Sequence, residues 1–419
     1  MIDYSKFPNR KIACIDMMSF YASCMASLHN LDVRTVPIAV VGNFEQKGSV
    51  VLAASPPMKT RFGVKTGTRL YEIPHHPDIR LFEPKMAYFL DISMSITRIL
   101  HKYVPVKSIL VYSVDESFVD LSGTEKLWGD PAQTIKDIQA EIYETLNLPS
   151  TAGMGPNMLM AKLALDLEAK KTGFAKWTFD DVSKKLWSVS PLSEMWGIGR
   201  QTQISLNGMG LFSVGDLAHA DLQTLEKKFG VMGNQYFYHA WGIDLSEIGL
   251  SHMQGQVSYG KSQILMRDYN TRTEINVVLL EMCEDVARKV REKQQAGRTI
   301  SLGIGYSRNT LGGSFQRSRT IGGATNDTMK IYEVCKELLD EFHDGRPVRQ
   351  ISLSITKLED EHSIQISLFD EHKWRNRKIG QTMDALRNKY GSTAVLRAVS
   401  YTEAGTAIKR SKLVGGHKG

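Results

Sequence analysis

The chain has 419 residues, of which 42% are hydrophobic and 23% charged, a composition typical of a globular protein with more than one domain. No stretch reaches the roughly 18 apolar residues of a membrane span, and the start, MIDYSKFPNRK, lacks the apolar centre of a signal peptide. The four cysteines lack C-x-x-C spacing, which argues against a zinc site or a disulfide framework. We therefore expect a cytoplasmic protein with no membrane partner.

The net charge of +7 is unevenly distributed along the chain. Residues 370–419 contain 11 Lys or Arg against 4 Asp or Glu, which accounts for the whole excess. A basic terminal segment is typical of nucleic-acid binding. The alternative is a solubilising tail.

In chain order, the N-terminal part alternates patterns of strand and helix. Short strands are expected within 36–55, a small helix at 57–62 and a longer helix at 84–104. The principal elements follow the order of a split βαβ, or ferredoxin-like, sheet with the first strand and the hairpin adjacent. They are a strand at 10–16, a helix from Ser19, a hairpin at 108–122, a helix at 131–146, a strand at 150–155 and a helix capped by Asn157.

Two adjacent carboxylates interrupt the apolar hairpin SILVYSVDESFVDLS. Because neighbouring strand residues point to opposite faces, one of Asp115 and Glu116 should face the core, where an unpaired carboxylate is costly. Asp16, at the end of the neighbouring strand, adds a third carboxylate. Such oxygen ligands suit two Mg²⁺ ions roughly 3.5–4 Å apart that support phosphoryl transfer. The alternative for Asp115 and Glu116 is a surface turn.

The stretch MWGIGRQTQISLNGMGLFSVGDLA, residues 195–218, is rich in helix boundaries. Its Gly-Ile-Gly turn lies between two apolar segments, which predicts a helix–hairpin–helix. Gly197 and Gly199 would let backbone N–H groups approach a DNA phosphate. The alternative is a plain αα-hairpin turn.

Residues 249–260 are polar and rich in Gly and Ser, which predicts a linker to a second α+β unit. In SFQRSRTI, Arg317 and Arg319 alternate with hydroxyl residues and should leave one face of a strand, where they suit a phosphate backbone. The alternative is a solvated outer face. The expected elements are a helix at 275–295, strands at 299–307 and 314–322, a helix at 326–342 and a strand at 349–358.

Several of these strings together resemble the motifs of Y-family translesion DNA polymerases. CIDMMSFYASC is similar to the D-x-D-x-F-[FY]-A motif and YSVDESFVDLS to the S-x-D-E motif, and the likeness continues through MGPNMLMAKLALDLEAKKTG. It covers about residues 10–370. The stretch VVLAASPPMKTRFGVKTG and the extended C-terminal segment resemble most the DNA polymerase V catalytic-subunit (UmuC-like) branch of bacteria.

The resemblance implies an active site for template-directed addition of deoxynucleotides to a primer 3′-OH. Asp16, Asp115 and Glu116, with the backbone carbonyl of Met17, would bind two Mg²⁺ ions, for which Mn²⁺ is a substitute. Tyr21 matches the steric gate that excludes a ribose 2′-hydroxyl; the alternative for it is a core aromatic. Phe20, the residue before Tyr21, is expected either to contact the nucleotide or to pack in the core. Ser113 matches a supporting serine.

The resemblance also implies cations that bind the triphosphate, and here the sequence departs from the pattern. Lys170 matches the expected lysine, although one extra residue precedes it. The fingers Tyr falls on Pro57 and the fingers cation on Thr60, so Lys59 or Arg61 would substitute, with Lys59 preferred because the prolines shift the helix start. Met18 replaces the second Asp of D-x-D, a position not expected to bind metal.

The string QISLFD, residues 365–370, resembles the peptide with which bacterial polymerases bind the sliding clamp, or β subunit. Gln365, Leu368 and Phe369 would be its anchors; the alternative is a last strand, since QISLSI occurs at 350–355.

The resemblance implies an α+β right-hand polymerase in the nucleoid, acting in DNA damage tolerance and the SOS response. Its partners would be primer–template DNA, deoxynucleotides, the clamp, and a recombinase filament or accessory subunits. A nucleotidyl cyclase and an inactive DNA-binding accessory protein are the rival interpretations. The implied parts are a palm (1–27 and 85–180), fingers (28–84), a thumb (181–248), a linker (249–258), a little finger (259–360), and a clamp peptide with a basic tail (361–419).

Overall fold

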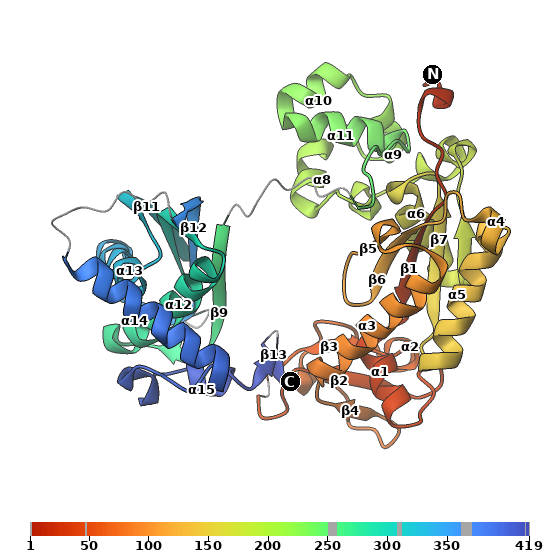
Figure 1. The fold of residues 1–419 in the computed structure, drawn as a ribbon. Helices are drawn as coiled ribbons and strands as arrows, with labels where there is room; N and C mark the ends of the chain where they lie inside the picture. Colours follow the sequence, from red (N-terminus) through yellow and green to blue (C-terminus); the bar gives the residue numbers. More distant parts are fainter. Residues whose placement is uncertain are drawn as a thin grey trace. The chain divides into compact units, whose positions relative to one another are not determined.

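The computed structural model describes residues 2–46, 48–249, 258–307, 312–361, 371–414 and 416–418, with the backbone alone at 371–374 and 417–418. The chain forms two compact units, Met1–Leu250 with His417–Gly419, and Ser251–Gly416 (Figure 1). The division falls within the predicted linker. In the described ranges no helix combines the length and the apolar character that crossing a membrane requires.

The first unit is built on a five-stranded sheet with the order β5-β6-β1-β7-β8. β1 is antiparallel to both of its neighbours, β6 and β7, as the ferredoxin-like order predicts. β5 forms the hairpin with β6, and β8 runs parallel to β7. The strands are β1 (Ile12–Met17), β5 (Ile109–Val111), β6 (Glu116–Asp120), β7 (Ser150–Gly155) and β8 (Phe174–Lys176).

Side-chain alternation along β1 separates two hydrophobic cores. Ala13 and Ile15 join the core under three helices on one face, whereas Ile12 and Cys14 join the core on the other. Asp16 continues the second series, so it shares the face of Cys14. The three helices of the first core are α1 (Phe20–Leu28), α3 (Met86–Tyr103) and α5 (Pro131–Leu146).

The second core contains α6 (Met158–Ala164), which lies directly on β7. A Cβ atom on Gly153 would lie 2.2 Å from both the Ala161 carbonyl oxygen and the Leu165 nitrogen, so only glycine permits this approach. The helix then continues through a π-helical turn, η4 (Leu165–Ala169), into α7 (Lys170–Thr172).

The fingers region contains a small sheet with the order β3-β2-β4 and a core of its own. The short helix α2 begins with two prolines, which fit a first helical turn, and ends at Gly63 with φ of 69°. The elements are β2 (Ile38–Val41), β3 (Val51–Ala54), α2 (Pro56–Phe62), η2 (Leu70–Glu72) and β4 (Arg80–Phe82).

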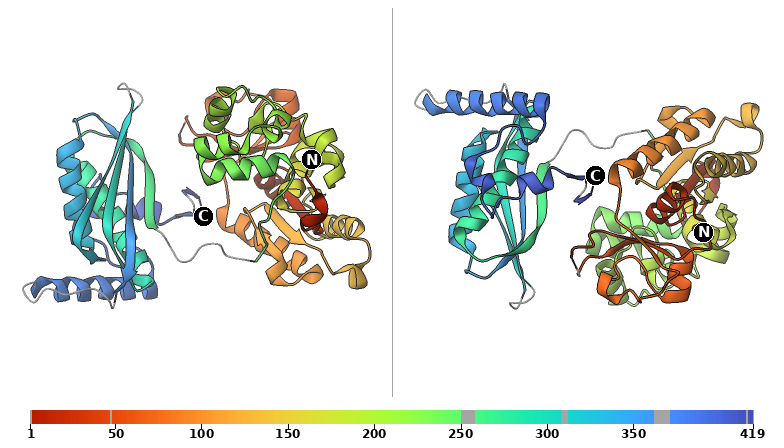
Figure 2. Two further views of the ribbon diagram at one scale, coloured as in Figure 1. Left: turned by 90° about the horizontal axis from the view of Figure 1, so that it is seen from above. Right: turned by 90° about the horizontal axis from the view of Figure 1, so that it is seen from below.

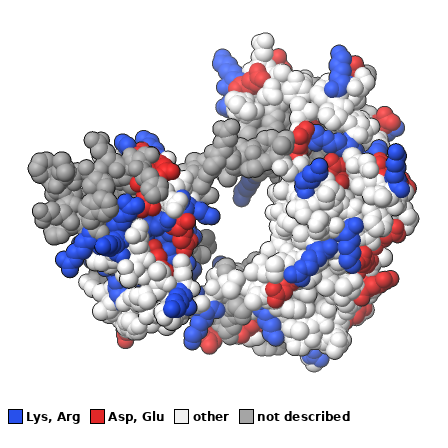
Figure 3. All heavy atoms as spheres, viewed as in Figure 1, with Lys and Arg blue, Asp and Glu red and all other residues white. Residues whose placement is uncertain are grey.

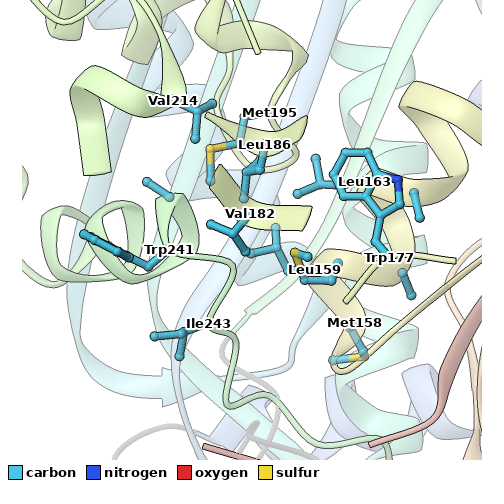
Figure 4. Packing of buried hydrophobic residues seen from close by; sticks show 14 of the residues in the cluster. Met158, Leu159, Leu163, Trp177, Val182, Leu186, Met195, Val214, Trp241 and Ile243 are labelled. Carbon is cyan, nitrogen blue, oxygen red and sulfur yellow. The ribbon is translucent and has the colours of Figure 1, made fainter. Parts of the chain in front are cut away.

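The thumb helices pack on the α6 side of the sheet. In Figure 4, Val214, Leu186 and Met195 of the thumb lie in one core with Leu159 and Leu163 of α6. The helices are α8 (Arg200–Asn207), α9 (Val214–Ala218), α10 (Leu222–Phe229) and α11 (Val231–Ala240). Shorter elements of this unit are η1 (Tyr4–Lys6), η3 (Val106–Ser108), α4 (Glu125–Trp128), η5 (Phe179–Asp181), η6 (Val182–Leu186) and η7 (Leu192–Glu194).

The second unit is an antiparallel sheet with the order β11-β10-β12-β9, and two helices cover one of its faces (Figure 2). The expected linker ends earlier than residue 260, because strand β9 already begins at Ser258. This strand was not predicted. The elements are β9 (Ser258–Tyr269), α12 (Arg272–Glu292), β10 (Gln295–Tyr306), β11 (Ser314–Thr325), α13 (Thr328–Phe342) and β12 (Val348–Asp360).

The predicted basic tail is a folded segment that packs on α12. Asp384 forms a two-bonded ion pair with Arg291, at 2.6 and 3.0 Å. Glu284, which is buried, accepts hydrogen bonds from Arg387 at 3.0 Å and Arg397 at 2.7 Å. Figure 3 shows Lys and Arg side chains over α14. The segment comprises α14 (Glu371–Tyr390), η9 (Ala398–Tyr401), α15 (Ala407–Arg410), β13 (Leu413–Val414) and β14 (His417–Lys418).

Candidate active site

The two central strands of the palm sheet bring the predicted carboxylates together. Asp16 in β1 is the direct cross-strand partner of Glu116, the first residue of β6. Asp115 lies in the turn before β6, where its carbonyl accepts a hydrogen bond from the Met17 N–H at 2.9 Å and its carboxylate accepts one from Ser113 at 2.6 Å. Because only Glu116 belongs to the strand, the adjacent pair is not forced onto opposite faces.

Glu116 is held by two neighbours on the α6 face of the sheet. Its Oε1 lies 2.8 Å from Lys162 Nζ, and the Cys14 thiol donates to the same oxygen at 3.0 Å. Burial and the Glu116 charge raise the pKa of Cys14 well above its usual range, which keeps the thiol a donor. Burial opposes the charge of Lys162, but its contacts with Glu116 and Asp166 outweigh that effect and raise its pKa.

The Asp16 carboxyl is difficult to ionise. Burial, the largest cause, raises its pKa to about 6; Asp115 and Glu116 add to this rise, whereas Lys170 and Lys162 oppose it. A bound dication would reverse this balance, because it favours the ionised carboxylate.

The donors fit Mg²⁺ in kind, because carboxylate and backbone carbonyl oxygens are the hard ligands that this ion prefers. Among the residues that the structure describes, however, no three His, Cys, Asp or Glu side chains are gathered as a ready-made metal site. Glu116 is instead engaged by Lys162 and Cys14. The residues that would hold the metal are Asp16, Asp115, Glu116 and, through its carbonyl, Met17.

The extra residue before Lys170 is accommodated by the π-helical turn η4. Such a turn fits one additional residue into an α-helix. Lys170 Nζ consequently lies 3.8 Å from Asp16 Oδ2 and 2.7 Å from Asp166 Oδ1. Burial disfavours the Lys170 charge, but the Asp166 hydrogen bond and charge outweigh this and raise the pKa of Lys170.

The two candidate cations of the fingers have different surroundings. Lys59 Nζ donates to Ser19 Oγ at 3.1 Å, and this contact places the ammonium beside the carboxylates. Burial and the nearby Lys170 lower the pKa of Lys59. Arg61 pairs with Asp78 at 3.0 Å on the surface of the fingers. The structure therefore brings Lys59, and not Arg61, to the site.

The two aromatic candidates, Tyr21 and Phe20, also have different surroundings. Tyr21 stacks on Phe89 with ring centroids 4.6 Å apart and an interplanar angle of 22°. Burial and the nearby Asp115 raise the pKa of Tyr21. Phe20 is 3% exposed within the palm core, as its alternative assignment expected, and its assignment to the nucleotide is corrected because core packing occupies its ring.

Two charged residues of the site were missed from the sequence. Lys162 and Asp166 lie on the same helix as Lys170, at intervals of four residues, and contact the predicted ligands directly or through each other. Their spacing within the motif string was the available signal.

Comparison with known proteins decides the family. The impB/mucB/samB family model matches residues 15–166, and the model of the impB/mucB/samB family C-terminal domain matches residues 256–368. UvrX of Bacillus subtilis (strain 168), a protein assigned to UV-damage repair, is 53% identical over 100% of both chains. The chain belongs to the impB/mucB/samB family.

Other similar proteins agree with this membership. DNA polymerase IV 2 of Bacillus subtilis (strain 168) is 35% identical over 97% of this chain and 98% of its own. A solved Y-family DNA polymerase chimera, Dbh-Dpo4(243-245)-Dbh, has the same fold, with a TM-score of 0.66, 19% identity, and coverage of 83% of this chain and 98% of its own. The predictions of a Y-family DNA polymerase and of its α+β architecture are confirmed. The UmuC-like branch stays a prediction.

In this impB/mucB/samB-family chain the predicted glycine turn lies just before α8. Gly197 has φ of 93°, and Gly199 is the N-cap of α8. The turn that joins α8 to α9 contains Gly210 instead, with φ of 82°. A Cβ atom on any of the three would meet nothing within 4 Å, but the Gly210 N–H already donates to the Asn207 carbonyl at 3.0 Å. Gly197 and Gly199 therefore leave more room for a phosphate than Gly210 does.

The predicted arginines of β11 do leave one face of the strand, but that face is the helix-covered one. Arg319 pairs with Glu337 and Glu341 of α13, each at 2.6 Å. The Arg317 guanidinium lies 5.0 Å from the Phe342 ring centroid. Arg319 is thus neutralised within the protein, which corrects its assignment to a phosphate backbone, and Arg317 points the same way.

The opposite face of this sheet is lined with hydroxyl groups that the sequence analysis did not select. Ser301 bonds Ser318 across the strands at 2.8 Å, and Thr299 bonds Thr320 at 2.9 Å. The pattern was readable as Ser or Thr at alternate positions. We call this the hydroxyl face: Ser262, Thr299, Ser301, Ser318, Thr320, Ser352, Ser354 and Thr356.

The predicted clamp anchors Gln365, Leu368 and Phe369 lie outside the described residues. The chain on either side is ordered: Glu361 pairs with Arg377 of α14 at 2.6 Å.

Proposed function

We propose that the chain is a translesion-type DNA polymerase that adds deoxynucleotides to a primer 3′-OH by two-metal phosphoryl transfer. The main support for this proposal is that Asp16 pairs across the strands with Glu116, next to Asp115, in a chain of this family. Three half-buried carboxylates gathered in one place have no evident structural use, because each costs free energy unless it is compensated. We name Asp16, Asp115 and Glu116 the acid cluster.

The acid cluster and the Met17 carbonyl would hold the Mg²⁺ ions. When bound, Mg²⁺ supplies charge neutralisation at the phosphates and a more acidic primer hydroxyl. The raised pKa of Asp16, to about 6, supports this use, because its ionised form is poorly compensated by protein groups alone. Mn²⁺ offers similar oxygen-ligand chemistry.

Two lysines would bind the triphosphate of the incoming deoxynucleotide. Lys170, 3.8 Å from Asp16, and Lys59, which donates to Ser19, both lie beside the acid cluster. Each is only partly neutralised by protein groups, so each retains donors for phosphate oxygens. Arg61 has no part in this proposal because Asp78 already pairs with it.

Tyr21 would exclude ribonucleotides. Its ring stacks on Phe89, and Asp115 is close enough for its charge to raise the pKa of the Tyr21 hydroxyl. A fixed ring beside the metal ligands is suited to blocking a 2′-hydroxyl, whereas a mobile ring would yield.

Primer–template DNA would contact the open glycine backbones of the thumb and the hydroxyl face of the second unit. Hydroxyl and backbone N–H groups bind phosphates without reading sequence, which suits a polymerase that must accept any template. The basic α14 adds a salt-dependent attraction. The name of the UV-damage repair relative supports action on damaged templates, and a role in the SOS response is proposed on the resemblance alone.

We retain the sliding clamp as a proposed partner through residues 365–369. Its support is the string QISLF alone. The recombinase filament and accessory subunits remain proposals on the resemblance.

Primer extension tests this function against its rivals. A labelled primer on a longer template is incubated with Mg²⁺ and the four deoxynucleotides, and a parallel reaction with nucleoside triphosphates alone is tested for cyclic products. We expect extension to the template end and no cyclic nucleotide. Template binding without extension would identify an inactive accessory protein, and cyclic products would identify a cyclase.

A further inference from the structure

Five charged side chains form an alternating series across the candidate site. Lys162 Nζ lies 2.8 Å from Glu116 and 3.2 Å from Asp166. Lys170 Nζ lies 2.7 Å from Asp166 and 3.8 Å from Asp16. Asp166 therefore stands between both lysines, and each lysine in turn contacts a member of the acid cluster.

Asp166 is the nearest anion to Lys170. The Lys170 side chain is 49% exposed, and a lysine of that exposure samples many rotamers unless a partner fixes it. Its other acidic contact, Asp16, is 1.1 Å farther from Nζ than Asp166 is. Asp166 thus determines where the Lys170 ammonium lies.

The backbone that carries Asp166 is itself fixed. Asp166 belongs to the π-helical turn η4, whose start lies against β7 at Gly153, with no space for a side chain between them. Glu168, on the same turn, faces away from the site, because it accepts hydrogen bonds from Trp177 at 2.8 Å and Lys185 at 2.9 Å. The two acids of the turn thus have different partners: Asp166 contacts Lys162 and Lys170, whereas Glu168 contacts Trp177 and Lys185.

We propose that Asp166 is a positioning residue for nucleotide addition, which holds the Lys170 ammonium where the triphosphate binds and completes the charge balance of Lys162. This inference rests on the proposed polymerase function. Asp166 does not touch the nucleotide; it acts through Lys170.

The test compares Asp166→Asn with the matched control Glu168→Gln, which removes the other carboxylate of the same turn. Steady-state incorporation of one deoxynucleotide is measured on one template. We expect Asp166→Asn to raise KM for the nucleotide about tenfold with a smaller change in kcat, because ground-state and transition-state contacts through Lys170 weaken together. Glu168→Gln should leave both constants near the wild-type values, and Asp166→Glu should recover part of the loss.

A double-mutant cycle tests whether the effect passes through Lys170. If it does, adding Asp166→Asn to Lys170→Met should change KM little beyond Lys170→Met alone. Independent, multiplicative effects would overturn the inference, as would an Asp166→Asn variant that matches Glu168→Gln.

A second measurement separates this inference from the proposed function. Affinity for a deoxynucleoside triphosphate with Ca²⁺ is determined by calorimetry for the wild type, Asp166→Asn and Glu168→Gln. If the wild type fails to extend primers but only Asp166→Asn weakens nucleotide binding, the polymerase function is wrong, and what stands of the inference is that Asp166 positions Lys170 for the triphosphate. If the wild type extends primers and neither variant alters KM or affinity, the inference is wrong and the function stands.

Discussion

Asp16 and Glu116 lie opposite each other on adjacent strands, but their counter-charges differ. Glu116 Oε1 is 2.8 Å from the buried Lys162, whereas Asp16 Oδ2 is 3.8 Å from the more exposed Lys170. Burial, which Lys170 offsets only in part, raises the pKa of Asp16 to about 6. Asp16 should therefore respond to pH and to a dication.

We predict that Asp16→Asn stabilises the metal-free protein above about pH 6 and has little effect on stability below about pH 4. The folded state binds the Asp16 proton with a pKa of about 6 and the unfolded chain with an ordinary value of 3.8. Between these values the folded state binds more protons, so stability falls as pH rises. Asp16→Asn has no carboxylate to ionise, so it should avoid this loss in the free energy of unfolding, which is on the order of 2–3 kcal/mol.

Thermal unfolding in EDTA over this pH range measures the difference between variant and wild type. The control is Asp91→Asn, which changes an exposed Asp of α3. A stability difference that stays constant with pH would contradict the assignment of the raised pKa to Asp16.

Replacing Tyr21 with alanine should admit ribonucleotides. If the ring fixed on Phe89 blocks the 2′-hydroxyl, the efficiency ratio of deoxynucleotide to ribonucleotide should fall by roughly 10²-fold or more, since a steric clash of a few kcal/mol is removed. Deoxynucleotide use should change less. Phe20→Leu is the control for altered packing. If the efficiency ratio is unchanged in Tyr21→Ala, the tyrosine has only a packing role.

The docked C-terminal segment should contribute to the stability of the second unit. Arg291→Met leaves Asp384 buried without its partner, which should lower the free energy of unfolding by about 3–5 kcal/mol. The double variant Arg291→Met/Asp384→Leu should recover much of that loss, because it removes both charges. Urea unfolding gives the values.

An exposed pair provides the control for this series. Lys330→Met breaks an ion pair with Glu333 in which the two side chains are 53% and 57% exposed. The free energy of unfolding should therefore change by less than about 1 kcal/mol. If Arg291→Met costs no more than Lys330→Met, the C-terminal segment is not held as described.

Clamp binding should depend on the apolar anchors of the predicted peptide. Leu368→Ala with Phe369→Ala should abolish clamp-stimulated synthesis, because short peptides bind through a few side chains that fill pockets. Basal extension of a short primer–template should remain. Full clamp response in this variant would place the contact elsewhere, and joint loss of folding and basal activity would make the string a structural strand.

The sequence predicted the palm well because its information is local. The apolar run of β1 and the stripe Ile135, Ile138 and Ile142 in α5 each follow from a few neighbouring residues. The close approach of α6 to Gly153 was not predicted, because it depends on the position of another element.

The misses depend on distant partners. Strand β9 was not predicted, and its first three residues were assigned to the linker, because its Gly and Ser residues gain their order from pairing with β12. The segment that contains α14 was predicted to be a tail because Asp384 pairs with Arg291, 93 residues away in the sequence. Arg319 was read as a DNA contact because its acidic partners lie on the next helix. Such pairings leave no local pattern in the chain.

Single-nucleotide incorporation by the wild type and by Glu116→Gln, with Mg²⁺ on the same primer–template, tests the central claim most directly. Asp115→Asn is measured beside it, and DNA affinity is determined for each protein. If the acid cluster binds the catalytic metals, each variant should lose roughly 10²-fold or more of the incorporation rate, since metal stabilisation of the transition state is worth several kcal/mol, while DNA affinity stays within about twofold. Incorporation at the wild-type rate by either variant would contradict the two-metal account.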